Sequence, residues 1–162
     1  MPTPDAQTLA RSIEGVSLVV DRATHSLRLE RMLDASPQEA FDAWTQPDQV
    51  TCWWDPAGEP LTRCEIDLRV GGDFVFVSKG HAEMPFAGRY VEIVPGVRLA
   101  FEAMGAAGRV GFAAVGEQTK LSVEIQCRSD EHLDQFLQMR VDEGTARTIA
   151  NLAAFVAAFR AG

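Results

Sequence analysis

The segment Ala35–Pro56, ASPQEAFDAWTQPDQVTCWWDP, decides the fold, because it predicts two short helices directly after a first strand. Ser36 offers an N-cap hydroxyl, Pro37 suits the first helical position, and Glu39 follows at the spacing of a capping box. Pro47 ends this first helix. The second short helix is expected to carry the two adjacent tryptophans near the end of the segment.

The chain before this segment has two parts. In the second part, Leu27, Leu29 and Leu33 alternate with charged residues, which is the period of two expected of a half-buried strand. The first part, residues 1–23, mixes Pro, Asp, Gln, Ser and Gly and shows no convincing alternation. We therefore expect a partly ordered N-terminal appendage over residues 1–23 and one folded domain over residues 24–162.

The chain after the quoted segment predicts a run of short strands. Ile66, Leu68 and Val70 alternate with charged residues, and a glycine pair then marks a turn. Similar alternation and further turn signals continue to residue 127, which brings the predicted total to about seven antiparallel strands.

One long helix is predicted at the C-terminus. Ser129 and Asp130 are suited to cap it, and an apolar stripe continues to Phe159 over more than seven turns. Gly144 lies within this stripe at a cost of about 1 kcal/mol relative to Ala, either because its space belongs to a ligand or because a strand approaches closely. Strands followed by one long helix predict an α+β protein.

Composition and charge exclude several classes of function. The chain has 162 residues, enough for one domain, and its net charge of -8 opposes binding to nucleic acid. No stretch approaches the length of an apolar membrane span, and the first residues lack the features of a signal peptide, so a cytoplasmic location without membrane insertion is expected.

Metal and cofactor sites are not expected. Cys52, Cys64 and Cys127 are widely spaced and form no CxxC pair, and the three histidines show no helical pairing of the zinc type. The cysteines are therefore interpreted as buried or idle thiols, with no metal and no cofactor.

Several motifs resemble those of a known family. Ala-Trp-Thr-x-Pro at residues 43–47, Trp-Trp-x-Pro at residues 53–56 and Asp-x-Arg-x-Gly-Gly at residues 67–72 occur in the order and spacing of the family named for the activator of the ninety-kilodalton heat-shock protein ATPase. Similar elements extend the resemblance over roughly residues 27–159. One departure is that Thr145 follows Gly144, where family members commonly have Trp.

The resemblance implies a helix-grip fold of the START-like superfamily, in which a curved antiparallel sheet and the long helix enclose a cavity. This superfamily, which includes the polyketide cyclases and the Bet v-like proteins, contains lipid carriers, aromatase/cyclases and stress proteins. The fold therefore implies no single activity. Because Thr145 stands where family members commonly have Trp, the cavity beside the helix is expected to be larger or to contain more water.

Aromatic residues of the predicted strands are the main candidates for lining this cavity. An apolar interior with few polar groups is typical of small-molecule sites. The alternative is plain core packing, because a buried Phe contributes roughly 1.5–3 kcal/mol whether or not a ligand exists. The candidates are Phe74, Phe76, Phe86, Tyr90, Phe101 and Phe112.

Four further residues complete the expected ligand site. Trp54 is expected to help close the cavity mouth, although a simple hydrophobic plug is the alternative. Gly144 and Thr145 are expected to leave room beside the helix. Arg31 is in phase with the inward leucines and is expected to meet an anionic or carbonyl group, unless a bulge turns it outward. Trp44 is expected to be plain core.

Three functions follow from these expectations. The leading one is non-enzymatic binding of a small hydrophobic or aromatic ligand by a carrier, sensor or sequestering protein. The second is a polyketide-cyclase-like or hydrolase-type enzyme, in which Arg31, Tyr90, His81 or Glu83 would polarise a substrate. The third is a protein that interacts with a chaperone, as the name of the family suggests. A homodimer is also considered, because the sheet is expected to have an exposed edge.

Overall fold

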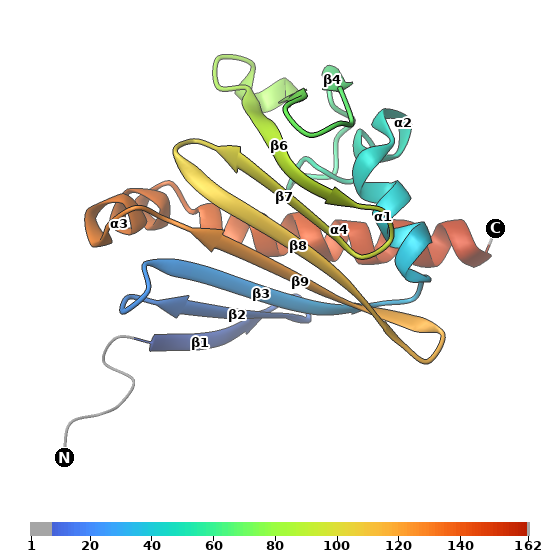
Figure 1. Cartoon of the computed structure of the whole chain (residues 1–162), viewed down its shortest axis with the longest axis horizontal. Coiled ribbons are helices and arrows are strands. Elements are labelled where there is room, and N and C mark those ends of the chain that lie inside the picture. The colour runs from blue at the N-terminus through green and yellow to red at the C-terminus, as the bar shows by residue number, and fades with distance from the viewer. Residues whose placement is uncertain (1–7, 162) are drawn as a thin grey trace.

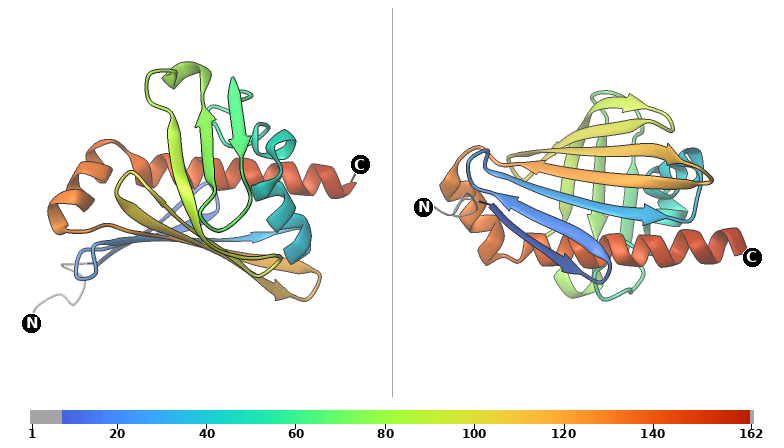
Figure 2. Two further views of the ribbon diagram at one scale, coloured as in Figure 1. Left: turned by 45° about the horizontal axis from the view of Figure 1, so that its top comes forward. Right: turned by 90° about the horizontal axis from the view of Figure 1, so that it is seen from below.

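The structure is a computed structural model that describes residues 8–161. Its centre is one antiparallel sheet of nine strands in the order β1-β2-β3-β9-β8-β7-β6-β5-β4. The sheet is strongly twisted, so that β4–β6 stand at a steep angle to β1–β3 (Figure 2). The strands are β1 (Thr8–Ile13), β2 (Val16–Asp21), β3 (Ser26–Leu33), β4 (Arg63–Ile66), β5 (Asp73–Val77), β6 (Phe86–Val94), β7 (Arg98–Ala103), β8 (Ala106–Val115) and β9 (Gln118–Gln126).

The helices lie on one side of this sheet. The C-terminal helix α4 runs across the sheet, and α1 packs near its C-terminal half (Figure 1). The α-helices are α1 (Pro37–Thr45), α2 (Pro47–Val50), α3 (Asp130–Gln138) and α4 (Val141–Ala161), and a short 3₁₀ helix spans Lys79–His81. This arrangement confirms the predicted α+β helix-grip fold.

The start of α1 is confirmed residue by residue. The backbone N–H of Glu39 donates to Ser36 Oγ at 3.1 Å, and the backbone N–H of Ser36 donates to Glu39 Oε1 at 2.8 Å. Two of the free N–H groups at the helix start are thus satisfied by the capping box. The helix ends before Pro47, as its sequence predicts.

The strand count of about seven is corrected to nine. The extra strands are β1 and β2, which come from the segment expected to be an appendage; β2 pairs with β3, and β1 pairs with β2 at the edge of the sheet. Val16, Leu18 and Val20 of β2 are buried on the inner face. Their alternation is hard to recognise because the outward position between the last two is also apolar, Val19.

The predicted single C-terminal helix is two helices. The chain leaves α3 after Gln138 and enters α4 at Val141, and Arg140 between them has a φ of 59°. A non-glycine residue with this φ ends a regular helix, yet it has no signature in the sequence. Gly144 therefore lies in the first turn of α4 instead of mid-helix, where its cost is smaller.

The strand predicted through Ile66, Leu68 and Val70 ends at Ile66. Leu68 and Val70 are exposed, in a loop over residues 67–72. Its tight turn needs glycine, because a Cβ at Gly72 would lie 2.1 Å from the carbonyl oxygen of Asp67. The Asp-x-Arg-x-Gly-Gly motif thus forms a compact turn and not a strand.

The core lies between the inner face of the sheet and α4. Leu27, Leu29 and Leu33 of β3 face buried residues of α4, among them Ile149 and Leu152. Near α1 the core is filled by large aromatic side chains. Nearer the start of α4 the filling is incomplete.

Candidate ligand-binding cavity

A cavity of about 220 Å³ lies between the sheet and the first turns of α4. The strands β6 to β9 form one wall, α3 and α4 form the opposite wall, and residues of α1 and of the loop after α2 close one end. It is lined by Trp44, Trp54, Pro56, Phe86, Phe101, Ala103, Met104, Ala106, Gly108, Val123, Ile125, Phe136, Val141, Gly144, Thr145, Thr148 and Ile149.

The face of α4 that lines the cavity follows helical spacing. Val141, Gly144, Thr145, Thr148 and Ile149 stand at the i, i+3, i+4, i+7 and i+8 positions that share one face. A Cβ at Gly144 would meet only Pro56 Cγ, at 4.0 Å. Gly144 therefore leaves open space beside the helix, and no strand approaches it closely.

An aromatic wall forms the side of the cavity nearest β5 and β6. The rings of Trp54 and Phe86 lie 5.0 Å apart between centroids, and both line the cavity together with Phe101. Behind them, Phe74 packs edge-on against Phe101 at 5.4 Å. Phe74, Phe76 and Tyr90 form a second layer, which borders a small void of about 10 Å³ and not the cavity.

Five of the expected site residues thus line the cavity directly, namely Trp54, Phe86, Phe101, Gly144 and Thr145. Strand alternation places Phe74, Phe76 and Tyr90 on the same inner side, but other rings separate them from the open space. Burial raises the pKa of Tyr90 far above its usual range, with a smaller contribution from Cys64.

The two remaining expected residues, Arg31 and Phe112, lie away from the cavity. Phe112 packs against Phe41, with ring centroids 5.6 Å apart, and fills the core below α1. Arg31 lies beside the β1–β2 turn, where its Nη1 donates to the carbonyl oxygen of Met32 at 3.0 Å. Its place is set by the β1–β2 hairpin, which was not predicted from the sequence.

The loop after α2 is fixed to α4 by side-chain hydrogen bonds. The hydroxyl of Thr148 donates to the carbonyl oxygen of Trp54 at 2.9 Å. One turn further on, Asn151 Nδ2 donates to the carbonyl oxygen of Asp55, also at 2.9 Å. These bonds hold the Trp54 indole in place against the cavity.

At the end of the cavity near α3 and the β7–β8 turn, the lining residue Met104 is 44% exposed. The backbone N–H of Arg128 donates to His132 Nδ1 at 3.1 Å, so the imidazole proton is on Nε2, which donates to the carbonyl oxygen of Met104 at 3.2 Å. Phe136, one turn later, packs on the imidazole and lines the cavity. His132 thus joins the start of α3 to the β7–β8 turn.

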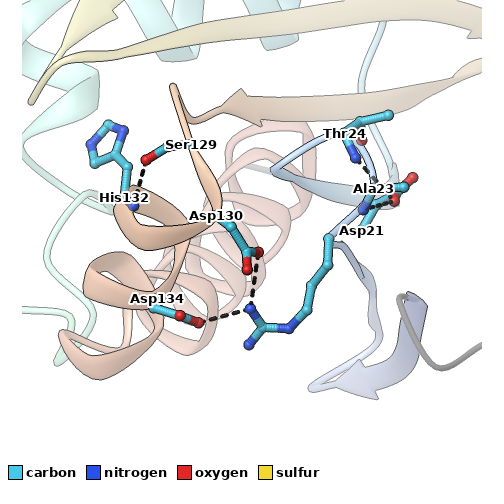
Figure 3. Close-up of polar contacts among 8 residues, drawn as sticks. Asp21, Ala23, Thr24, Ser129, Asp130, His132 and Asp134 are labelled. Atoms are coloured by element: carbon cyan, nitrogen blue, oxygen red, sulfur yellow. Dashed lines mark hydrogen bonds and ion pairs between the residues drawn. The ribbon is translucent and has the colours of Figure 1, made fainter.

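Ion pairs connect α3 to the sheet at the β2–β3 turn as well. Arg22, in the β2–β3 turn, reaches Asp134 at 2.8 Å and Asp130 at 3.2 Å, and the N-cap hydroxyl of Ser129 accepts from the backbone N–H of His132 (Figure 3). In parallel, Arg11 of β1 pairs with the buried Asp142 at the start of α4 at 2.6 Å. β1 and the β2–β3 turn thereby contact the two helices that enclose the cavity.

The candidates for acid or base catalysis lie outside the cavity. His81 and Glu83 are exposed, and His81 borders a separate surface groove with Met84 and Met139. No ionisable side chain is found among the described residues that line the cavity. Within residues 8–161, no group of three or more His, Cys, Asp or Glu side chains is placed to hold a metal ion.

Several lining residues were not predicted from the sequence. Trp44, expected to be plain core, lines the cavity, and Val141, Thr148 and Ile149 share the helix face of Gly144. Helical spacing from Gly144 is a signal that points to these three residues. No comparable signal points to Met104, because the sequence of the β7–β8 turn does not indicate which part of the protein the turn contacts.

A curved antiparallel sheet that grips a C-terminal helix, with an apolar cavity between them, defines a helix-grip protein of the START-like class. The family model described as "Activator of Hsp90 ATPase homolog 1-like protein" matches residues 34–157. The chain belongs to this family. No match is found among the curated proteins.

Solved structures are similar over most of the chain. The crystal structure of a Nitrosomonas europaea protein is 20% identical, covers 85% of this chain and 97% of its own, and has a TM-score of 0.76. A Chromobacterium violaceum protein is 27% identical, covers 80% of this chain and 95% of its own, and has a TM-score of 0.66. An Aeromonas hydrophila protein described as AHSA1-like is 20% identical over 81% of this chain and 92% of its own, with a TM-score of 0.65.

Proposed function

We propose that this protein binds a small hydrophobic or aromatic molecule in the cavity between the sheet and α4, as a carrier, sensor or sequestering protein. The observation that carries the proposal is an apolar, partly aromatic cavity of about 220 Å³ that no side chain of the described residues fills. Native interiors are close-packed, so an unfilled space of this size calls for an occupant.

The volume limits the size of the ligand. An apolar cavity of about 150 Å³ is large enough to hold benzene. Drug-sized ligands occupy pockets of about 300–1,000 Å³. The cavity, at about 220 Å³, therefore suits a molecule with a single substituted ring or a short aliphatic chain.

The lining favours binding over catalysis. A general acid or base must lie within hydrogen-bond reach of the group it serves. The ionisable candidates named from the sequence, Arg31, His81 and Glu83, lie away from the cavity, and Tyr90 stands behind the aromatic wall.

The experiment that tests the proposal is a thermal-shift screen of small aromatic and fatty compounds, repeated on Gly144→Trp. A ligand at about a hundred times its dissociation constant adds roughly 2.7 kcal/mol to the free energy of unfolding. We expect such stabilisation in the wild type and none in Gly144→Trp, because the indole would occupy the open space beside Pro56.

The matched control is Ala154→Trp, which adds the same indole to the exposed side of α4. It should keep the stabilisation by ligands. Stabilisation that survives in Gly144→Trp would place the binding site elsewhere, and a screen without any stabilising compound would count against the binding function itself.

A further inference from the structure

We propose that Thr145 determines the specificity of the cavity, and that the ligand is a small neutral aromatic molecule with one oxygen that accepts a hydrogen bond, such as a phenol or an aryl ketone. This inference rests on the proposed binding function and goes beyond it, because it names the ligand class and the side chain that selects it.

The position of Thr145 on α4 supports this role. On the cavity-lining face, Val141 lies one turn before Thr145 and Gly144 directly before it, and Thr148 and Ile149 lie one turn after it. Thr145 therefore stands at the middle of the helical wall. Gly144 beside it has no side chain, so a ligand can approach this turn of the helix closely.

Most polar groups around the cavity already have partners. The Thr148 hydroxyl donates to the carbonyl oxygen of Trp54, and the carbonyl oxygen of Met104 accepts from His132. The indoles of Trp44 and Trp54 carry donors only. The hydroxyl of Thr145 forms no hydrogen bond with any residue in the described part of the chain.

This uncommitted hydroxyl discriminates between ligands. A ligand that fills the cavity removes water from Thr145 and must either replace its hydrogen bond or leave the hydroxyl unpaired. Leaving a buried polar group unpaired weakens binding by roughly 5- to 100-fold. The Thr145 hydroxyl can donate or accept, whereas the two indoles can only donate, so an acceptor oxygen on the ligand is the group that can pair with all three.

The absence of ionisable groups from the described lining residues indicates that the ligand is neutral. A carboxylate or an ammonium group would lose its hydration in this cavity without gaining an opposite charge, which is costly. The rings of Trp54, Phe86 and Phe101 offer flat apolar surfaces that suit an aromatic body.

The test compares two probes of nearly equal shape, phenol and toluene, on three proteins. Dissociation constants are measured by calorimetric titration for the wild type, Thr145→Val and Thr145→Ser. Val has the shape of Thr without the hydroxyl, and Ser keeps the hydroxyl. The quantity of interest is the ratio of the toluene constant to the phenol constant, because the hydration of each free probe is the same for all three proteins.

We expect this ratio to fall by roughly 5- to 100-fold in Thr145→Val and to stay near the wild-type value in Thr145→Ser. Circular dichroism and thermal unfolding verify that each variant is folded. A ratio that agrees within about twofold between the wild type and Thr145→Val would overturn the role of Thr145 and leave the binding function standing. If neither probe binds the wild type, this inference fails, and the binding function is decided by the wider thermal-shift screen.

Discussion

At the scale of single residues, the alternation of side chains along a strand predicts which face of the sheet a residue lies on, but not whether it lines the cavity. Alternation along one predicted strand placed Phe74 and Phe76 on the same face, and the structure places them with Phe86 and Phe101 on the inner side of the sheet. The alternation did not predict which of them would border open space, because that depends on where α4 and its neighbours cross the sheet. Phe112 faces inward too, but α1 covers it.

Cys64 is a residue whose chemistry is set by burial. Burial raises the pKa of its thiol from 9.0 to about 11. The folded protein thus favours the neutral thiol over the thiolate. The stability that the titration of Cys64 contributes to the fold is fully present below about pH 9 and is lost as the pH rises through about 11. We expect half-maximal alkylation of Cys64 near pH 11 in the folded protein and near pH 9 in urea, measured by mass spectrometry of the modified peptide. If the pH of half-maximal alkylation is the same in the folded and the urea-unfolded protein, burial does not raise the pKa of Cys64.

At the scale of elements, local signals predicted where helices begin but not where one breaks. The capping box of α1 and the N-cap of α3 were both readable because each uses a specific side chain, Ser36 and Ser129. The break between α3 and α4 was not, since Leu133, Leu137 and Val141 keep their helical spacing across it. The backbone of Arg140 makes the turn without a glycine.

The attachment of α3 can be tested through His132. Replacing it by Leu leaves the N–H of Arg128 and the carbonyl of Met104 without partners, so we expect His132→Leu to lower the free energy of unfolding by about 1–3 kcal/mol. Urea denaturation followed by circular dichroism measures this change. The matched control is His81→Leu at an exposed position, which should stay within about 0.5 kcal/mol of the wild type. Equal losses in the two variants would show that the bridge to Met104 contributes nothing.

At the scale of the whole molecule, the order of elements after residue 24 was predictable, and the N-terminal hairpin was not. The first helix, the strands and the helical C-terminal region each carry their own local pattern, which the family motifs reinforce, although the break within that region is not part of the pattern. The hairpin of β1 and β2 has weak patterning, and its structure depends on pairing with β3 and on contact with α4. Such long-range contacts override local propensity.

Two leucines of the hairpin test whether it belongs to the same cooperative unit as the rest of the sheet. Leu18 is 1% exposed and Leu9 is 63% exposed. We expect Leu18→Ala to lower the free energy of global unfolding by about 2–5 kcal/mol, and Leu9→Ala to change it by less than about 0.5 kcal/mol, in thermal and urea unfolding. A separate early transition in Leu18→Ala, with the main one unchanged, would mean that the hairpin folds as an independent unit.

The grouping of the tryptophans gives the protein an internal optical probe. All three indoles lie in one cluster, with ring centroids 5.0 Å apart for Trp44 and Trp53 and 5.7 Å apart for Trp53 and Trp54. Trp44 and Trp54 border the cavity, whereas Trp53 is fully buried and donates to the carbonyl oxygen of Ala43 at 3.0 Å. A guest molecule would therefore change the emission of two fluorophores beside a shielded third, so that occupancy can be followed without any added dye.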